Sequence, residues 1–219
     1  MNKLLTTLFS LAVAAVTATS YAQEVKGDAK AGEKKIAMCI GCHGIKGYQA
    51  SFPEVYRVPM ISGQGAKYIT AALNAYRGGE RKHGTMRAIA SSMSDQDIAD
   101  VSAFYEAHGK GAAPAGAPAA PPTARVDALL KKGGCVACHG DNFSKPIDPS
   151  YPKVGGQHAD YVFVALKSYK TEGNTQVGRS NGIMAGIAKQ FSNTELKELS
   201  SYLATLPGDL RVVPESRFR

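Results

Sequence analysis

Four cysteines and two histidines form the clearest chemical pattern in the chain. The segments CIGCH at 39–43 and CVACH at 135–139 both read C-x-x-C-H, and together they contain all four cysteines. Two cysteines at this spacing can form thioethers with the two vinyl groups of one porphyrin, and the next residue can bind its iron through imidazole. The pattern predicts two covalently attached c-type haems, with thioethers from Cys39, Cys42, Cys135 and Cys138 and axial imidazoles from His43 and His139.

Three other uses of paired cysteines fit the sequence less well. A four-cysteine zinc site usually places its two C-x-x-C pairs about 15–20 residues apart, whereas 92 residues lie between Cys42 and Cys135. Thioredoxin-like redox pairs occur in a βαβ context, which the hydrophobic pattern does not indicate. Structural disulfides are possible in an exported protein, but they do not explain a histidine at the same position twice.

Two methionines at equivalent positions are the predicted sixth ligands of the irons. Met184 is the only methionine of the second half, and it lies eight residues before Ser192. Met86 lies eight residues before Ser94, which matches Ser192 in an internal repeat. Methionine also fills gaps in hydrophobic cores, but the repeated position favours ligation. The methionines set aside are Met60 and Met93, which lack a methionine counterpart, and Met38, which is too close to the first cysteine.

The other histidines are not expected to bind iron. His83 and His158 have no histidine counterpart in the repeat, and His108 is expected at the surface near a helix end. Histidine–methionine ligation raises the reduction potential and closes the sixth coordination position to oxygen or peroxide. The protein then positions and tunes two irons and contributes no catalytic side chain.

A repeat extends through both halves of the chain in a constant order. The second C-x-x-C-H lies 96 residues after the first, and residues 152–157 follow the matching residues 59–64 by 93. The segment from Ser192 follows the one from Ser94 by 98 residues. Because only the connecting loops change length, the repeat indicates two duplicated domains, each able to fold alone.

The ends of these domains are set by composition. Residues 109–123, GKGAAPAGAPAAPPT, have no apolar periodicity and predict an extended linker between domains at 23–108 and 124–219. Residues 1–22 combine Lys3, an apolar run and small residues before the expected cleavage after Ala22, as in a secretory signal peptide. That run is short for a membrane span, so we expect an exported protein located in the periplasm.

The hydrophobic pattern predicts an all-α fold with three helices in each domain and no strand. The first helix, near residues 29–38 or 125–132, leads into the C-x-x-C-H segment. The second has apolar residues at i, i+3, i+4 and i+7 from Ile69 or Val162. The third starts at a capping serine with an acid three residues later. Its expected apolar positions are Ile98, Val101 and Tyr105 in the first domain and Leu196, Leu199 and Leu203 in the second.

Charge and size limit the partners. The formal net charge is +8, but the basic residues are scattered, which favours an acidic protein partner over nucleic acid. Four haem propionates would offset about half of this charge. Domains of this size are marginally stable without a buried cofactor.

Together these residues make the chain resemble the cytochrome c4 family, diheme proteins with two class I cytochrome c domains. The most specific parts are the C-x-x-C-H segments, YPKVGGQHADYV at 151–162 and SDQDIAD at 94–100. The resemblance implies axial pairs His43/Met86 and His139/Met184, with the carbonyls of Pro59 and Pro152 accepting hydrogen bonds from the ligand imidazoles. The linker is longer than a tightly packed pair needs, which weighs against close contact between the domains.

The resemblance also implies the partners and leaves three functions open. Such proteins carry electrons from a quinol-oxidising complex or a periplasmic dehydrogenase to a terminal oxidase. The first hypothesis is a diffusible, monomeric shuttle, with peripheral association with a membrane left open. The second is a dedicated electron-accepting subunit of a sulfur-compound dehydrogenase. The third is a diheme peroxidase, which needs an open iron and a longer chain.

Overall fold

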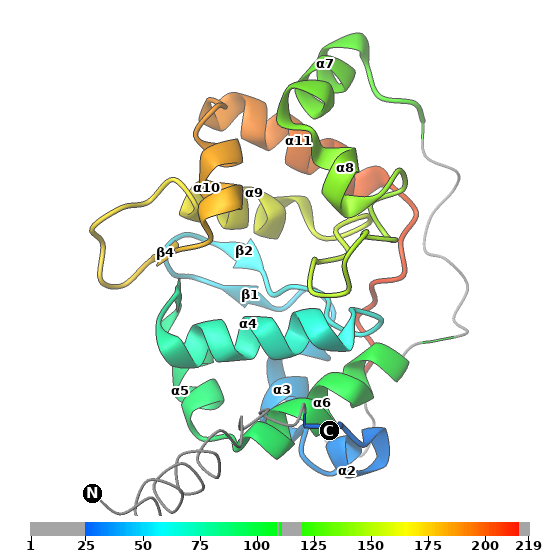
Figure 1. The fold of residues 1–219 in the computed structure, drawn as a ribbon, viewed down its shortest axis with the longest axis vertical. Coiled ribbons are helices and arrows are strands. Elements are labelled where there is room, and N and C mark those ends of the chain that lie inside the picture. Colours follow the sequence, from blue (N-terminus) through cyan, green and yellow to red (C-terminus); the bar gives the residue numbers. More distant parts are fainter. Residues whose placement is uncertain (1–24, 109, 111–119, 215–219) are drawn as a thin grey trace, which may run out of the picture.

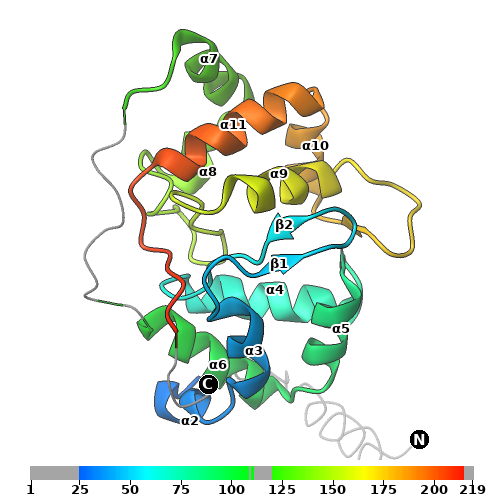
Figure 2. The same ribbon diagram turned by 180° about the vertical axis from the view of Figure 1, so that it is seen from behind.

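The computed structural model describes residues 25–108, 110 and 120–214. The expected signal peptide and most of the expected linker lie outside these residues. Figures 1 and 2 show two stacked groups of helices, one from each half of the chain, with short strands near the boundary. Within the described ranges, no helix has the length and apolar character needed to cross a membrane.

The first half consists of short helices with brief strands between them. The helices are α2 (Ala29–Glu33), α3 (Ala37–His43), α4 (Ala66–Gly78), α5 (Gly84–Ser91) and α6 (Asp95–Ala107). The strands are β1 (Gln49–Ala50), β2 (Tyr56–Arg57) and β3 (Arg81–Lys82).

The second half repeats this order with small differences. Its helices are α7 (Ala124–Gly133), α8 (Cys135–His139), α9 (Ala159–Ser168), α10 (Gly182–Ala188) and α11 (Asn193–Thr205). Its strand is β4 (Gly178–Arg179), which pairs with β3 of the first half.

The expected capping serines begin α6 and α11. Ser94 and Ser192 both form complete capping boxes, in which the serine accepts from the third residue's amide and that residue's carboxylate accepts from the serine amide. The apolar faces predicted for these helices are confirmed, since all six side chains are buried in the cores of their halves. Helices α2 and α4 pack against α6, and α7 and α9 pack against α11.

The single helix predicted near residues 29–38 is wrong, because the structure divides it into α2 and α3, whereas the helix predicted near residues 125–132 is confirmed by α7. In the first half, residues 34–36 form a turn between α2 and α3, and this turn leaves the side chain of Ile36 fully buried. In the second half, Gly134 separates α7 from α8 with a φ of +60°. Glycine adopts this left-handed conformation without the Cβ clash that other residues meet.

The prediction that the chain has no strand is also wrong. Each strand has two residues, so it cannot show the alternation of apolar and polar residues that identifies a strand in a sequence. The strands depend on tertiary pairing: β1 pairs with β2, and β3 pairs with β4 across the boundary between the halves.

The two halves are in close contact, contrary to the expectation drawn from the linker. The Gln64 amide group donates to the Lys153 carbonyl and accepts from the Lys153 N–H, at 2.9 Å in both cases. Gln157 makes the same two bonds to the backbone of Met60, at 2.9 and 3.1 Å. Both glutamines are buried, and Arg57 pairs with Asp160 nearby at 2.9 Å. The contact is made by residues inside the repeats, so linker length does not control it.

Candidate haem sites

A single cavity of about 1090 Å³ spans the boundary between the two halves. Its wall includes all four cysteines, both histidines of the C-x-x-C-H segments, and the methionines Met86 and Met184. Cavities for one small ligand usually have about 300–1,000 Å³, so this volume suits more than one group. The repeated wall residues indicate two neighbouring sites, one in each half, that open into each other.

Each histidine of a C-x-x-C-H segment is held by a proline carbonyl. His43 Nδ1 lies 2.8 Å from the carbonyl oxygen of Pro59, and His139 Nδ1 lies 3.0 Å from that of Pro152. A carbonyl oxygen only accepts, so Nδ1 donates and Nε2 keeps its lone pair. Burial lowers the pKa of both imidazoles, although the proline carbonyls act in the opposite direction. Both rings are therefore neutral and oriented, which is the form that binds a metal ion.

Met86 and Met184 lie on two short helices, α5 and α10, that the hydrophobic pattern did not predict. His83 begins α5, and its Nδ1 accepts from the Met86 N–H at 3.3 Å. Asn181 begins α10, and its Oδ1 accepts from the Met184 N–H at 2.9 Å. A polar residue three positions before each methionine was therefore the missed signal. These caps fix the first helical turn and with it the methionine that the turn carries.

The structure gives other roles to the histidines that were set aside. His83 is a helix cap, as described above, and His158 begins α9 without a side-chain capping bond. His108 was expected at the surface, but its ring is half-buried, stacks on Phe104 and has Nδ1 2.9 Å from the Ser62 hydroxyl.

The other methionines of the first half differ in their surroundings. Met38 is 54% exposed, and the backbone of Met60 is bonded to Gln157. Met93 lines the cavity and packs against the core of the first half, as Met86 does. Position in the cavity wall therefore does not show which of Met86 and Met93 is the ligand. The repeat favours Met86, because only Met86 has a methionine counterpart.

The cysteines do not have the properties of a thiolate site. All four are free. Burial raises the pKa of the Cys39 thiol to about 11 and also raises that of Cys135, whereas reactive thiols have lowered pKa values. In the described part of the chain, no three His, Cys, Asp or Glu side chains are grouped to hold a metal ion. Each half contributes two cysteines, a neutral histidine and a methionine to the wall of the shared cavity, and this set fits a porphyrin iron better than zinc or a dithiol.

Two arginines in the cavity wall were not predicted from the sequence. Arg81 and Arg179 both line the cavity. They are 98 residues apart, the same offset that relates Met86 to Met184. The signal that could have identified them is therefore an arginine at the same position in both repeats.

Comparisons with known proteins show similarity to cytochromes c. A family model described as Cytochrome c matches residues 29–109 and again residues 123–207. Cytochrome c4 of Stutzerimonas stutzeri is 32% identical over 223 residues, which cover 94% of this chain and 100% of that protein. The crystal structure of reduced recombinant cytochrome c4 from Pseudomonas stutzeri has a TM-score of 0.58 and 30% identity, covering 82% of this chain and 99% of that one.

A further relative has a name that mentions a donor enzyme. The protein named thiosulfate dehydrogenase electron acceptor, also from Stutzerimonas stutzeri, is 29% identical over 214 residues. The match covers 89% of this chain and 92% of that protein.

Proposed function

This chain belongs to the cytochrome c4 family, and we propose that it carries electrons through irons bound by His43 with Met86 and by His139 with Met184. A diheme cytochrome c is an electron-transfer protein rather than an enzyme, and its two domains bind two covalently attached haem c groups. The ligand assignment rests on one observation, which is that both halves contain the same arrangement of side chains. In both halves a carbonyl-bound histidine and a methionine on a capped helix line the same cavity.

The side chains of the cavity have separate tasks in this proposal. Cys39, Cys42, Cys135 and Cys138 attach the haems through thioethers. Bound haem supplies an iron that takes up and releases one electron. The carbonyls of Pro59 and Pro152 keep Nδ1 protonated and orient Nε2 toward the cavity. The methionine sulfurs favour the reduced iron and close its sixth position.

We place the protein in the periplasm, between a donor and a terminal oxidase. The leader-like sequence of residues 1–22 supports export. The donor in this proposal is a quinol-oxidising complex or a periplasmic dehydrogenase. The scattered excess of basic residues supports partners with acidic docking surfaces.

A second candidate is a dedicated electron acceptor of a sulfur-compound dehydrogenase. The full-length similarity to a protein named thiosulfate dehydrogenase electron acceptor favours it. The two candidates share the haem chemistry and differ in the donor and in how long the complex with that donor lasts.

Replacement of the methionines tests the ligand assignment. In the holoprotein, Met184→Ala is expected to open the second iron, lower its reduction potential and allow carbon monoxide to bind the reduced form. Met93→Leu is the matched control, because Met93 also lines the cavity, and it should leave both potentials unchanged. An unchanged potential and absorption spectrum in Met184→Ala would disprove the assignment, and rapid peroxide turnover by the unaltered protein would favour a peroxidase.

Stopped-flow reduction separates the two candidate donors. We expect reduction of the holoprotein by quinol-oxidising membranes and its reoxidation by membranes with an active terminal oxidase. Rapid reduction by a thiosulfate dehydrogenase, in a complex that co-purifies at a fixed ratio, would instead support the dedicated acceptor.

A further inference from the structure

Two arginines meet at the boundary between the domains. Strand β3 pairs antiparallel with β4, and Arg81 lies opposite Arg179 in this register. The Ser180 N–H donates to the Glu80 carbonyl at 2.8 Å and extends the pairing by one more bond. Residues opposite each other on antiparallel strands have Cα atoms about 4.5–5.5 Å apart. The fold therefore brings two positive side chains from different domains together.

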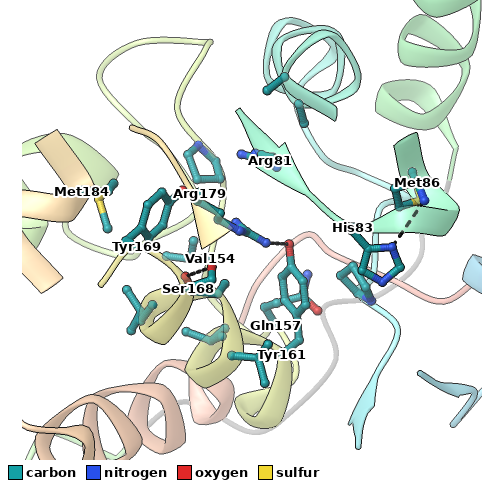
Figure 3. Close-up of a pocket in the computed structure, with 18 of the residues that line it drawn as sticks. Arg81, His83, Met86, Val154, Gln157, Tyr161, Ser168, Tyr169, Arg179 and Met184 are labelled. Carbon is teal, nitrogen blue, oxygen red and sulfur yellow. Dashed lines mark hydrogen bonds between the residues drawn. The ribbon is translucent and has the colours of Figure 1, made fainter. Parts of the chain in front are cut away.

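Each guanidinium is held by tyrosines of its own domain, as Figure 3 shows for Arg179 between Tyr161 and Tyr169. Arg81 Nη2 donates to the Tyr68 hydroxyl and Arg179 Nη2 to the Tyr161 hydroxyl, both at 3.1 Å. The guanidinium carbons lie within cation–π range of the ring centres. The distances are 5.2 and 5.7 Å for Arg81 over Tyr68 and Tyr76, and 5.6 and 5.5 Å for Arg179 over Tyr161 and Tyr169.

Neither of these arginines has an acidic partner among the described residues. Ion pairs involve Arg57, Arg77 and Arg125, whereas Arg81 and Arg179 each donate to one tyrosine hydroxyl and line the cavity. A guanidinium has five N–H donors, and a positive charge removed from water is costly unless an anion pairs with it. Two such charges opposite each other increase that cost, so the cavity is built to receive an anion.

We infer that Arg81 and Arg179 together bind the propionate carboxylates of the two haems and raise the reduction potentials of both. The inference rests on the proposed haem ligation, because the haems bring the only carboxylates that this proposal adds to the cavity. Planar guanidinium matches carboxylate geometry and can bind it through two parallel bonds. Reduction adds one electron to an iron and makes the site more negative, so a fixed cation nearby favours the reduced form.

The pairing across the boundary makes this effect common to both domains. Arg81 belongs to the first domain and Arg179 to the second, yet they occupy one place in the shared cavity. In Figure 3, Arg179 lies between the labelled Met86 and Met184, the proposed ligands of the two irons. Each arginine is therefore a positioning and tuning residue for both haems.

Redox titration of variant holoproteins tests this inference. Arg179→Gln is expected to lower the midpoint potentials of both haems, and Arg179→Lys to restore part of the shift because it keeps the charge without the planar fork. The haems are told apart by the NMR signals of iron-bound methionine methyl groups, assigned with Met86→Ala and Met184→Ala. Arg77→Gln is the matched control, since it removes the same charge from a surface pair with Asp95, and it should move neither potential.

Two results would overturn the inference or part of it. Potentials that shift in Arg179→Gln no more than in Arg77→Gln would remove the propionate role. A shift confined to the second haem would remove the coupling between domains. If Arg179→Gln does not fold, Arg81→Gln provides the same test from the other strand. If the proposed haem ligands are wrong, the NMR signals of iron-bound methionine methyl groups will not be those expected for Met86 and Met184. A wrong role for the arginines leaves these signals as expected, so the two failures can be told apart.

Discussion

His83 and Asn181 are different residues that cap the start of two equivalent helices. His83 accepts from the Met86 N–H and Asn181 from the Met184 N–H. Loss of a capping side chain costs about 1 kcal/mol. We therefore expect His83→Ala to lower the stability of the first domain by about that amount, whereas His83→Asn should preserve it. Thermal unfolding of the reduced holoprotein, followed by haem absorption, measures both.

Asn181→Ala is the matched variant for the second domain and should lose a similar amount. If His83→Asn proved as unstable as His83→Ala, the contribution of His83 would come from its ring instead. That ring makes an edge contact with Tyr76, with centres 6.4 Å apart.

Asp100 is a buried carboxylate that ties α2 and its flanking residues to α6. It accepts from the Asp28 N–H at 2.8 Å, from Lys35 Nζ at 2.7 Å and from Gln96 Nε2 at 2.8 Å, and its side chain is 3% exposed. Burial raises the pKa of Asp100, but the contacts with Lys35 and the other donors outweigh it and hold the pKa below the usual value. The charged form is therefore the stable one in the folded domain.

This depressed pKa predicts a specific acid sensitivity. A carboxyl with a lowered folded pKa stabilises the protein above its unfolded pKa of about 4, and the stability is lost as pH falls below that value. We expect Asp100→Asn to lower the melting temperature of the first domain at pH 7 by roughly 5 °C or more. The variant should also weaken the loss of stability that occurs as pH falls below about 4.

Glu198 provides the control, because it occupies the position equivalent to Asp100 in the second domain. It pairs with Arg125 at 2.6 Å, but these side chains are 31% and 64% exposed. Exposed ion pairs contribute little, so Glu198→Gln should change the melting temperature little. Equal effects of the two substitutions would contradict the role given to Asp100.

At the scale of the elements, the two interdomain glutamines hold the segments that orient the haem ligands. Met60 and Lys153, which they bind, directly follow Pro59 and Pro152. In the double variant Gln64→Ala/Gln157→Ala, backbone groups at the boundary lose their partners, at a cost of about 1–3 kcal/mol for each that stays buried. We expect denaturant unfolding to separate into two transitions, one for each domain, observed by haem absorption and circular dichroism.

Gln190→Ala is the control for this double variant. Gln190 is exposed, follows α10 and donates to the Gly186 carbonyl of that helix, within its own domain, so its loss should not separate the domains. Coincident transitions in the double variant would show that other contacts set the cooperativity.

The same elements show what the sequence can and cannot predict. Helices α6 and α11 were predictable because capping serines and apolar positions repeat at helical spacing. Met86 could be chosen over Met93 because an offset of 98 residues leads from Met86 to Met184. Helices α5 and α10 were missed because their buried faces are short. The equivalent caps, His83 and Asn181, also differ in type.

The boundary between domains was the least predictable feature. Gln64 and Gln157 were recognised as equivalent, but equivalence does not show that each reaches into the other domain. Strands β3 and β4 have two residues each, so their pairing depends on the tertiary fold. Arg81 and Arg179 gain their special position through this pairing, and no pattern within one domain indicates it.

At the scale of the whole molecule, the segment after α11 crosses back to the first domain. The Arg211 N–H donates to the Ser62 carbonyl at 3.0 Å. Lys153 Nζ lies 2.9 Å from both the Gly63 carbonyl oxygen and the Asp209 carboxylate. This segment adds to the glutamine bonds, the Arg57–Asp160 pair and the β3–β4 pairing. The domains are therefore joined by several contacts spread over the boundary.

These contacts predict that the covalent linker is dispensable once the protein has folded. A protease site introduced within residues 111–119 allows the linker to be cut in the purified holoprotein. Cutting removes the high effective concentration that a linker provides but none of the contacts named above. We expect the cut halves to elute together in gel filtration with both reduction potentials unchanged. Separate elution would show that the linker maintains the contact, and the same cut in Gln64→Ala/Gln157→Ala should release a larger fraction of free halves because the buried bonds are already missing.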